Sequence, residues 1–165
     1  MPHTRHFPCL GRPLHLRTHA GPLLLAPRRN AHQSSLGGGL RIGKDSATGP
    51  DADGQYHHYL TLWMFALNRL SLASGEKSYN TQAIALAKAI HPRFVYNHSS
   101  ARPRMCWKMS IDLREPLVRS ERNLDPVDSL VVFRLLQDSH GPDSAVLAEE
   151  IGDYEKIVST KWGGL

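Results

Sequence analysis

A chain of 165 residues with 20 lysines and arginines against 15 acidic residues has a net charge of +5, and its length corresponds to one domain. The excess of basic residues lies within residues 1–44, so the remainder has 13 basic and 15 acidic residues. A nucleic-acid-binding domain should carry its basic residues on one folded surface, so we expect no nucleic-acid partner. No stretch approaches the roughly 18 uninterrupted apolar residues of a membrane-spanning helix, so we expect no membrane partner.

Residues 1–36 form a basic arm that contains five prolines, five of the ten histidines and no sustained hydrophobic periodicity. We interpret this arm as disordered or as a transit-like segment, because it has the arginines, serines and absence of acids that are typical of organelle targeting. Cys9 lies in the arm and Cys106 in the body, which gives no disulfide framework. A cytoplasmic, reducing setting is therefore expected. The folded domain is expected over residues 37–165.

The central prediction is a helix over residues 53–73. At ~100° per residue, one side of this helix carries a row of large apolar residues, namely Tyr56, Tyr59, Leu60, Trp63, Met64, Leu67 and Leu70. The opposite side carries Leu62, Phe65 and Leu72. A helix that is apolar on nearly all sides is normally buried, so we expect other helices to surround it. Gly75 is placed to end it in a left-handed conformation.

Three further elements complete the predicted fold. A second helix from about Tyr79, with Ala83, Ala87, Ile90 and Phe94 on one face, should stop or kink near His91 because of Pro92. The short link predicts an antiparallel helical hairpin. Asp125 followed by Pro126 indicates the N-cap and first position of a third helix. A last helix, over residues 143–158, presents Leu147, Ile151, Tyr154 and Val158 on one face.

Residues 105–118 alternate with a period of two, which is typical of a strand or hairpin. Trp107, Met109, Ile111 and Leu113 fall on one side, and Lys108, Ser110 and Asp112 on the other, with Pro116 as the expected end. The predicted fold class is therefore mainly α, built of antiparallel helical hairpins with a short β-hairpin-like segment.

Four segments resemble a largely uncharacterised group of bacterial and fungal proteins: LRIGK (40–44), DGQYHHYLTLWMFALNRL (53–70), RMCWKMSIDLREPLV (104–118) and DPVDSL (125–130). That group shows GGLRIGK, DGQYFHYLTKWMHAL and RMYWKMSIDLSRPLVPSMGQHDPLDG, and the likeness covers about residues 37–158. The group is similar to six-hairpin glycosidases, whose (α/α)₆ toroid carries a funnel at the mouth of its inner helices.

The resemblance implies a partial (α/α)₆ toroid and a carbohydrate as partner. Twelve helices of ~11–12 residues need roughly 200 residues, so a closed toroid exceeds this chain. Leu124 also stands where the group has a histidine. We therefore keep three hypotheses: a carbohydrate-active protein of six-hairpin glycosidase type, either active or inactive as a fragment; a non-catalytic helical remnant or interaction module; and a sugar epimerase-like enzyme. Exposed apolar flanks would also favour self-association.

Glycoside hydrolysis usually needs two facing carboxyl groups. By resemblance, Asp53 and Asp125 are the candidate catalytic pair and His57 positions the substrate. Tyr56, Thr61, Trp107, Lys108, Asp112 and Asp128 are the candidate substrate-binding residues. The four aspartates and the aromatic residues each have a structural alternative. Asp53 and Asp125 can cap helices, Asp112 can pair with Arg104 or Lys108, Asp128 can stabilise a helix N-terminus, and the aromatic residues fit a core.

The strip of His57, Thr61 and Asn68 along the central helix is the best candidate for the lining of a funnel. An epimerase would need a second histidine such as His91 from the neighbouring helix. We expect no cofactor and no metal. The Gly-rich run before Lys44 is followed by Asp45 instead of the Ser or Thr that a phosphate-binding loop needs. No His-x₃-His pair occurs in residues 37–165, and Cys9, His15 and His19 of the arm lack the second cysteine that would complete a zinc site.

Overall fold

The computed structural model describes residues 44, 46, 49, 51–120 and 124–163. The predicted arm and the Gly-rich run before Lys44 lie outside the described residues. The helices are α1 (His57–Ser74), α2 (Ser78–Phe94), α3 (Asp125–His140) and α4 (Ala148–Trp162). The strands are β1 (Gln55–Tyr56), β2 (Val95–Tyr96), β3 (Arg104–Met105), β4 (Lys108–Met109) and β5 (Pro116–Val118). The mainly α fold with a small antiparallel sheet is confirmed.

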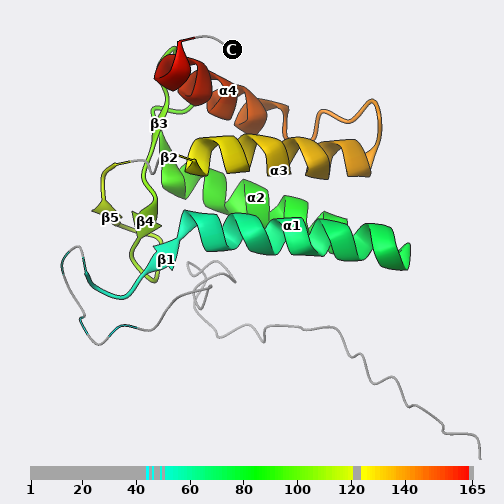
Figure 1. The fold of residues 1–165 in the computed structure, drawn as a ribbon, viewed down its shortest axis with the longest axis horizontal. Coiled ribbons are helices and arrows are strands. Elements are labelled where there is room, and N and C mark those ends of the chain that lie inside the picture. The colour runs from blue at the N-terminus through cyan, green and yellow to red at the C-terminus, as the bar shows by residue number, and fades with distance from the viewer. Residues whose placement is uncertain (1–43, 45, 47–48, 50, 121–123, 164–165) are drawn as a thin grey trace, which may run out of the picture.

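The helices form a stack in which α3 lies beside α1 and α4 lies beyond α3, with α2 against both α1 and α3 (Figure 1). The predicted α1–α2 hairpin is confirmed: α1 ends at Ser74 and is capped by Gly75, whose φ of 73° is the left-handed conformation that glycine adopts at low cost. The short strands gather at the N-terminal end of α1 (Figure 1). None of the described helices has the length and apolarity needed to cross a bilayer.

The hydrophobic core lies between the helices, and its most enclosed side chains are Phe94, Phe133, Tyr154, Met64, Ile90 and Leu136. The predicted inner faces of α2 and α4 are confirmed, because Ala83, Ala87, Ile90 and Phe94 are fully enclosed, as are Leu147 and Tyr154. The helical period sets these faces locally, so a sequence pattern is enough to find them.

The prediction that α1 is surrounded on all sides is wrong. Its buried residues are His57, Leu60, Thr61, Met64, Asn68 and Ser71, a single face. Leu62, Trp63 and Leu72 are 57 %, 50 % and 58 % exposed, and Phe65 is exposed as well. The polar residues turn inward because α2, α3 and α4 supply hydrogen-bond partners for them, and burial of a polar group is tolerated once it is bonded.

Several predicted boundaries also need correction. α1 begins at His57 instead of residue 53, because residues 55 and 56 pair with β4 as a strand. α2 continues through Pro92 to Phe94. The missing N–H of Pro92 removes one bond only two residues before the helix end, so little is lost. Pro116 begins β5 instead of ending a strand. α4 starts at residue 148 instead of 143, after turns over 142–147.

Two small antiparallel pairings connect the helices. Gln55 lies opposite Met109 and Tyr56 opposite Lys108, and β4 continues to β5 on its other side, which gives the order β1-β4-β5. β2 pairs with β3 directly after α2. Gly54 lies so close to β4 that an added Cβ would be 2.3 Å from the carbonyl oxygen of Met109, so glycine is required at this position for steric reasons.

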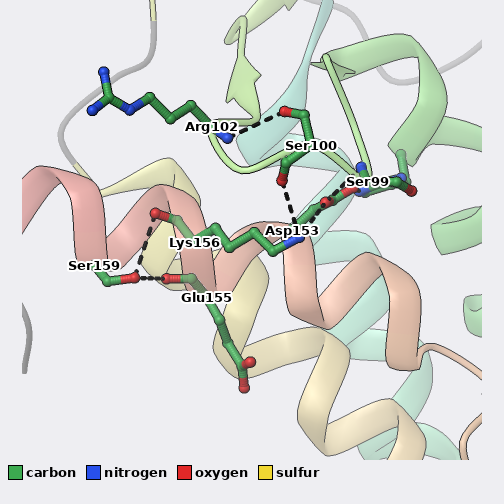
Figure 2. Close-up of polar contacts among 8 residues, drawn as sticks. Ser99, Ser100, Arg102, Asp153, Glu155, Lys156 and Ser159 are labelled. Carbon is green, nitrogen blue, oxygen red and sulfur yellow. Dashed lines mark hydrogen bonds and ion pairs between the residues drawn. The ribbon is translucent and has the colours of Figure 1, made fainter.

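A polar contact attaches α4 to the loop that follows β2 (Figure 2). The Asp153 carboxylate accepts the backbone N–H of Ser99 at 2.9 Å, and Lys156 Nζ donates to the carbonyl oxygen of Ser100 at 3.0 Å. Ser99 has a φ of 60°, a conformation that costs a non-glycine residue about 1–3 kcal/mol. The bond to Asp153 helps to hold this loop conformation.

Candidate functional site

A pocket of about 350 Å³ opens at the N-terminal end of α1. It is lined by Lys44, Asp51, Tyr56, His58, Tyr59, Trp107 and Asp125. Its volume is at the lower end of the ~300–1,000 Å³ that small-molecule sites occupy. Three of the seven lining residues, Tyr56, Trp107 and Asp125, were predicted from the sequence as site residues.

The pairing of β1 with the chain around β4 places the two central aromatic rings of the pocket. The backbone N–H of His57 donates to the carbonyl oxygen of Trp107 at 3.0 Å, and the N–H of Trp107 donates to the carbonyl oxygen of Ser120 at 3.2 Å. The ring centroids of Tyr56 and Trp107 are 5.4 Å apart with planes inclined at 44°. Both residues are half-buried. They were predicted as substrate-binding residues with a place in the core as the alternative, and they border the pocket.

Lys108 lies behind this aromatic pair. Its Nζ is 5.0 Å from the centroid of the Tyr56 ring, within the range of a cation–π contact. The alternation of residues 105–118 placed Lys108 on the polar side of a strand, and the resemblance made it a substrate-binding residue. Instead, β4 is the central strand and Lys108 is enclosed. Lys108 therefore supports Tyr56 from inside the protein.

Asp125 is the buried carboxylate of the pocket, with only 4 % of its surface exposed. It is the first residue of α3 and Leu124 is the N-cap, so the predicted helix start is shifted by one residue. The first turn of a helix has a partial positive charge that stabilises a carboxylate. The other carboxylate of the pocket, Asp51, is exposed and lies 3.7 Å from Lys44 Nζ.

The structure does not bring Asp53 to the pocket. One Asp53 carboxylate oxygen accepts the N–H of Gly54 at 2.9 Å, and Asp53 is not among the pocket-lining residues. Its proposed role as the cap of α1 is also wrong, because the N-cap of α1 is Tyr56 and makes no side-chain bond. The predicted pairing of Asp53 and Asp125 across one sugar is therefore not supported by the geometry of the pocket.

Asp112 and Asp128 lie on the surface, outside the pocket. Asp112 accepts a hydrogen bond from Ser110 Oγ at 2.7 Å and is 3.3 Å from Arg114 Nε. The Ser110 hydroxyl holds the pKa of this carboxyl below its usual value. Its partner is thus Arg114 instead of Arg104 or Lys108. Asp128 is in the first turn of α3, as predicted from the helix dipole.

His57 belongs to a hydrogen-bonded cluster inside the core. Its Nε2 is 3.0 Å from the Tyr154 hydroxyl, and its Nδ1 is 3.3 Å from Thr61 Oγ1 and 3.4 Å from Ser129 Oγ. Burial is the main cause that lowers the pKa of His57 to about 3, with the charge of His91 as a second cause. His57 and Thr61 are enclosed, so their predicted roles toward a substrate are corrected to structural ones.

Asn68, the third residue of the predicted funnel strip, is buried in a second polar layer. Its Nδ2 donates to Asn80 Oδ1 at 2.9 Å and to Ser139 Oγ at 2.8 Å. Asn80 in turn donates to the carbonyl oxygen of Leu136 at 3.0 Å. This layer connects α1, α2 and α3. The strip is real as a shared helix face, but it faces the core instead of a funnel.

The two histidines of the epimerase hypothesis are both buried around Tyr154. The ring centroid of His91 is 5.5 Å from that of Tyr154, and His91 Nε2 is 3.5 Å from Asp153 Oδ2. Burial lowers the pKa of His91 to about 4 against the opposing charge of Asp153. Neither histidine lines the pocket, so this pair does not reach a substrate there.

Sequence reasoning missed the partners of the buried cluster and four lining residues, namely Lys44, Asp51, His58 and Tyr59. The signal for His58 and Tyr59 was their place in the first turn of α1, close after Tyr56. Ser129 and Tyr154 are 72 and 97 residues from His57, and no local pattern indicates such a contact. Within the described residues, no three His, Cys, Asp or Glu side chains are arranged to hold a metal ion.

Comparison of the chain with protein-family models, with curated proteins and with solved structures finds no match.

Proposed function

We propose that this chain binds a carbohydrate in the pocket between β1, β4 and the start of α3, without hydrolysing it. The observation that supports this most strongly is the half-buried pair of Tyr56 and Trp107 beside the buried carboxylate of Asp125. The C–H face of a sugar ring packs well on aromatic rings, and sugar hydroxyls donate to a carboxylate, which only accepts.

The arrangement favours binding over catalysis. A glycosidase places two carboxyl groups on either side of the scissile bond, about 5–5.5 Å or about 6.5–9.5 Å apart. Asp125 is enclosed, whereas the second carboxylate of the pocket, Asp51, is in solvent and paired with Lys44. His57 is neutral and sealed in the core. Among the described residues, no second enclosed acid lines the pocket, so we assign it no acid–base pair.

The test is a titration with a panel of neutral mono- and disaccharides, followed by tryptophan fluorescence and calorimetry. Trp107→Ala should weaken binding roughly tenfold, equivalent to about 1.4 kcal/mol. Trp162→Ala is the matched control, because Trp162 is an exposed tryptophan at the end of α4. Equal binding by both variants, or no binding of any sugar, contradicts the proposal.

A second pair of variants tests the role of the carboxylate. Asp125→Asn should weaken sugar binding, whereas Asp128→Asn, one turn further along α3 and exposed, should leave it unchanged. The wild-type chain should not release the aryl group from aryl-glycosides. Turnover that disappears in Asp125→Asn is the result that contradicts a purely binding role.

A further inference from the structure

The side of α1 that faces away from the core is apolar and open. It carries Tyr59, Leu62, Trp63, Ala66, Arg69 and Leu70, all exposed, and we call these six residues the outer face of α1. Arg69 is the single charged residue among them. A surface helix of a globular protein normally places its polar residues on the side opposite the core. In α1 the arrangement is partly reversed, because His57, Thr61 and Asn68 are buried and large apolar side chains lie outside.

We propose that the outer face of α1 binds a second copy of this chain, in an antiparallel pair of α1 helices centred on Ala66. This inference rests on a surface centred on Ala66, about two turns further along α1 than the pocket, and Tyr59 is the one residue that the outer face shares with the pocket lining. Six large apolar residues of α1 are between 37 % and 58 % exposed. Four of them belong to the outer face, namely Tyr59, Leu62, Trp63 and Leu70, and Phe65 and Leu72 lie beside it. A long apolar row on one helix is the common geometry of helix-to-helix association.

The open area is enough for a weak specific dimer. At on the order of 200 Å² for each full side chain, these six residues leave roughly 550 Å² open in each chain. A two-fold pair that also covers Phe65 and Leu72 at the edge of the outer face would bury about twice that area, which reaches the ~1,000 Å² expected of a biological interface. The four large apolar residues of the outer face alone would contribute roughly 760 Å². It lies at the lower end of the range, so the dimer should form reversibly and depend on concentration.

The order of residues along α1 is self-complementary about Ala66. In an antiparallel pair centred there, Leu62 faces Leu70 of the second copy, and Trp63 faces Arg69. The small side chain of Ala66 lets the two helix axes approach closely, and an arginine opposite a tryptophan gives a cation–π contact. A two-fold interface requires this reciprocity, in which residue i contacts j and j contacts i.

The experiment is sedimentation equilibrium of the full chain over a wide range of concentrations under reducing conditions. The mass should rise from 18.4 kDa toward twice that value. Leu62→Glu should keep the chain monomeric. Val131→Glu is the matched control, because Val131 is a comparably exposed apolar residue on α3, and it should leave dimerisation unchanged. Circular dichroism verifies that each variant retains the helical content of the wild type.

The register has a test of its own. Leu70→Lys should also abolish the dimer, and the double variant with Leu62→Glu and Leu70→Lys should restore it. In the antiparallel pair, each carboxylate introduced at position 62 would face an ammonium group introduced at position 70 of the other copy. A wild-type monomer at all concentrations overturns the proposal. So does a Leu62→Glu variant that still dimerises, a double variant that stays monomeric, or a dimer that appears only after residues 1–43 are removed.

Discussion

The buried cluster around His57 predicts a steep loss of stability in mild acid. In the folded chain the pKa of His57 is lowered to about 3 by burial, whereas an unfolded histidine has a pKa of about 6.5. Between these two values the unfolded state binds a proton that the folded state excludes. The free energy of unfolding therefore falls as the pH falls.

The magnitude follows from the two pKa values of His57. Each pH unit in this window costs about 1.4 kcal/mol per histidine, so from pH 7 to pH 5 the free energy of unfolding should drop by about 2 kcal/mol because of His57. His91, whose pKa is lowered to about 4, changes stability in the same direction. For a domain of this size, 2 kcal/mol corresponds to a Tm decrease of roughly 8 °C.

The assay is urea unfolding at a series of pH values, for the wild type, His57→Gln and His140→Gln. His57→Gln should be less stable at pH 7 by roughly 1–3 kcal/mol, because Tyr154, Thr61 and Ser129 lose their bonding partner. Between pH 7 and pH 5, the free energy of unfolding of His57→Gln should fall by about 2 kcal/mol less than that of the wild type. His140 is exposed, so His140→Gln should follow the wild type. Parallel curves for all three chains refute the burial of a neutral His57.

Two further substitutions, Gly54→Ala and Asn68→Ala, test the packing, and each has a control variant. Gly54→Ala should destabilise the chain by about 1–3 kcal/mol and weaken sugar binding, because its Cβ would meet the Met109 carbonyl at 2.3 Å. Gly152→Ala, inside α4 with nothing within 4 Å of the new Cβ, should stabilise it by roughly 0.5–1 kcal/mol. Urea unfolding measures the free energy of unfolding of both glycine variants. Equal changes in the two variants contradict the close approach of β1 to β4. Asn68→Ala should cost about 1–3 kcal/mol, because Asn80 and Ser139 lose a buried donor. The exposed Thr81→Ala on α2, measured in the same way, should change stability by less than about 0.5 kcal/mol, and similar losses for these two variants argue against the buried polar layer.

Local chemistry in the sequence determined most of the secondary structure. The glycine after Ser74, the Asp125–Pro126 start and the spacing of Ala83, Ala87 and Ile90 each act within one or two helical turns. A pattern of this range can be interpreted without knowing the rest of the fold. The hairpin of α1 and α2, the start of α3 within one residue and the inner face of α4 were predictable for that reason.

The sequence was less informative about the site. Tyr56, Trp107 and Asp125 were predicted as site residues and do border the pocket. Asp53, Asp112 and Asp128 do not border it. The pairing of β1 with β4 directs Asp53 elsewhere, and the turn at Ser110–Arg114 directs Asp112 elsewhere. Asp128 faces solvent from α3. Whether a carboxylate reaches a given pocket depends on where distant strands meet, and alternation along one segment contains no information on that.

The tertiary structure alone decided which side of α1 is inside. Both sides of that helix are apolar in the sequence, so hydrophobic periodicity could not choose between them. The choice depends on where His57, Thr61 and Asn68 find hydrogen bonds, and their partners come largely from α2, α3 and α4. A buried polar group must be bonded, and the partners that satisfy it lie far along the chain. The fold therefore places these three residues inside and leaves Leu62 and Trp63 in solvent.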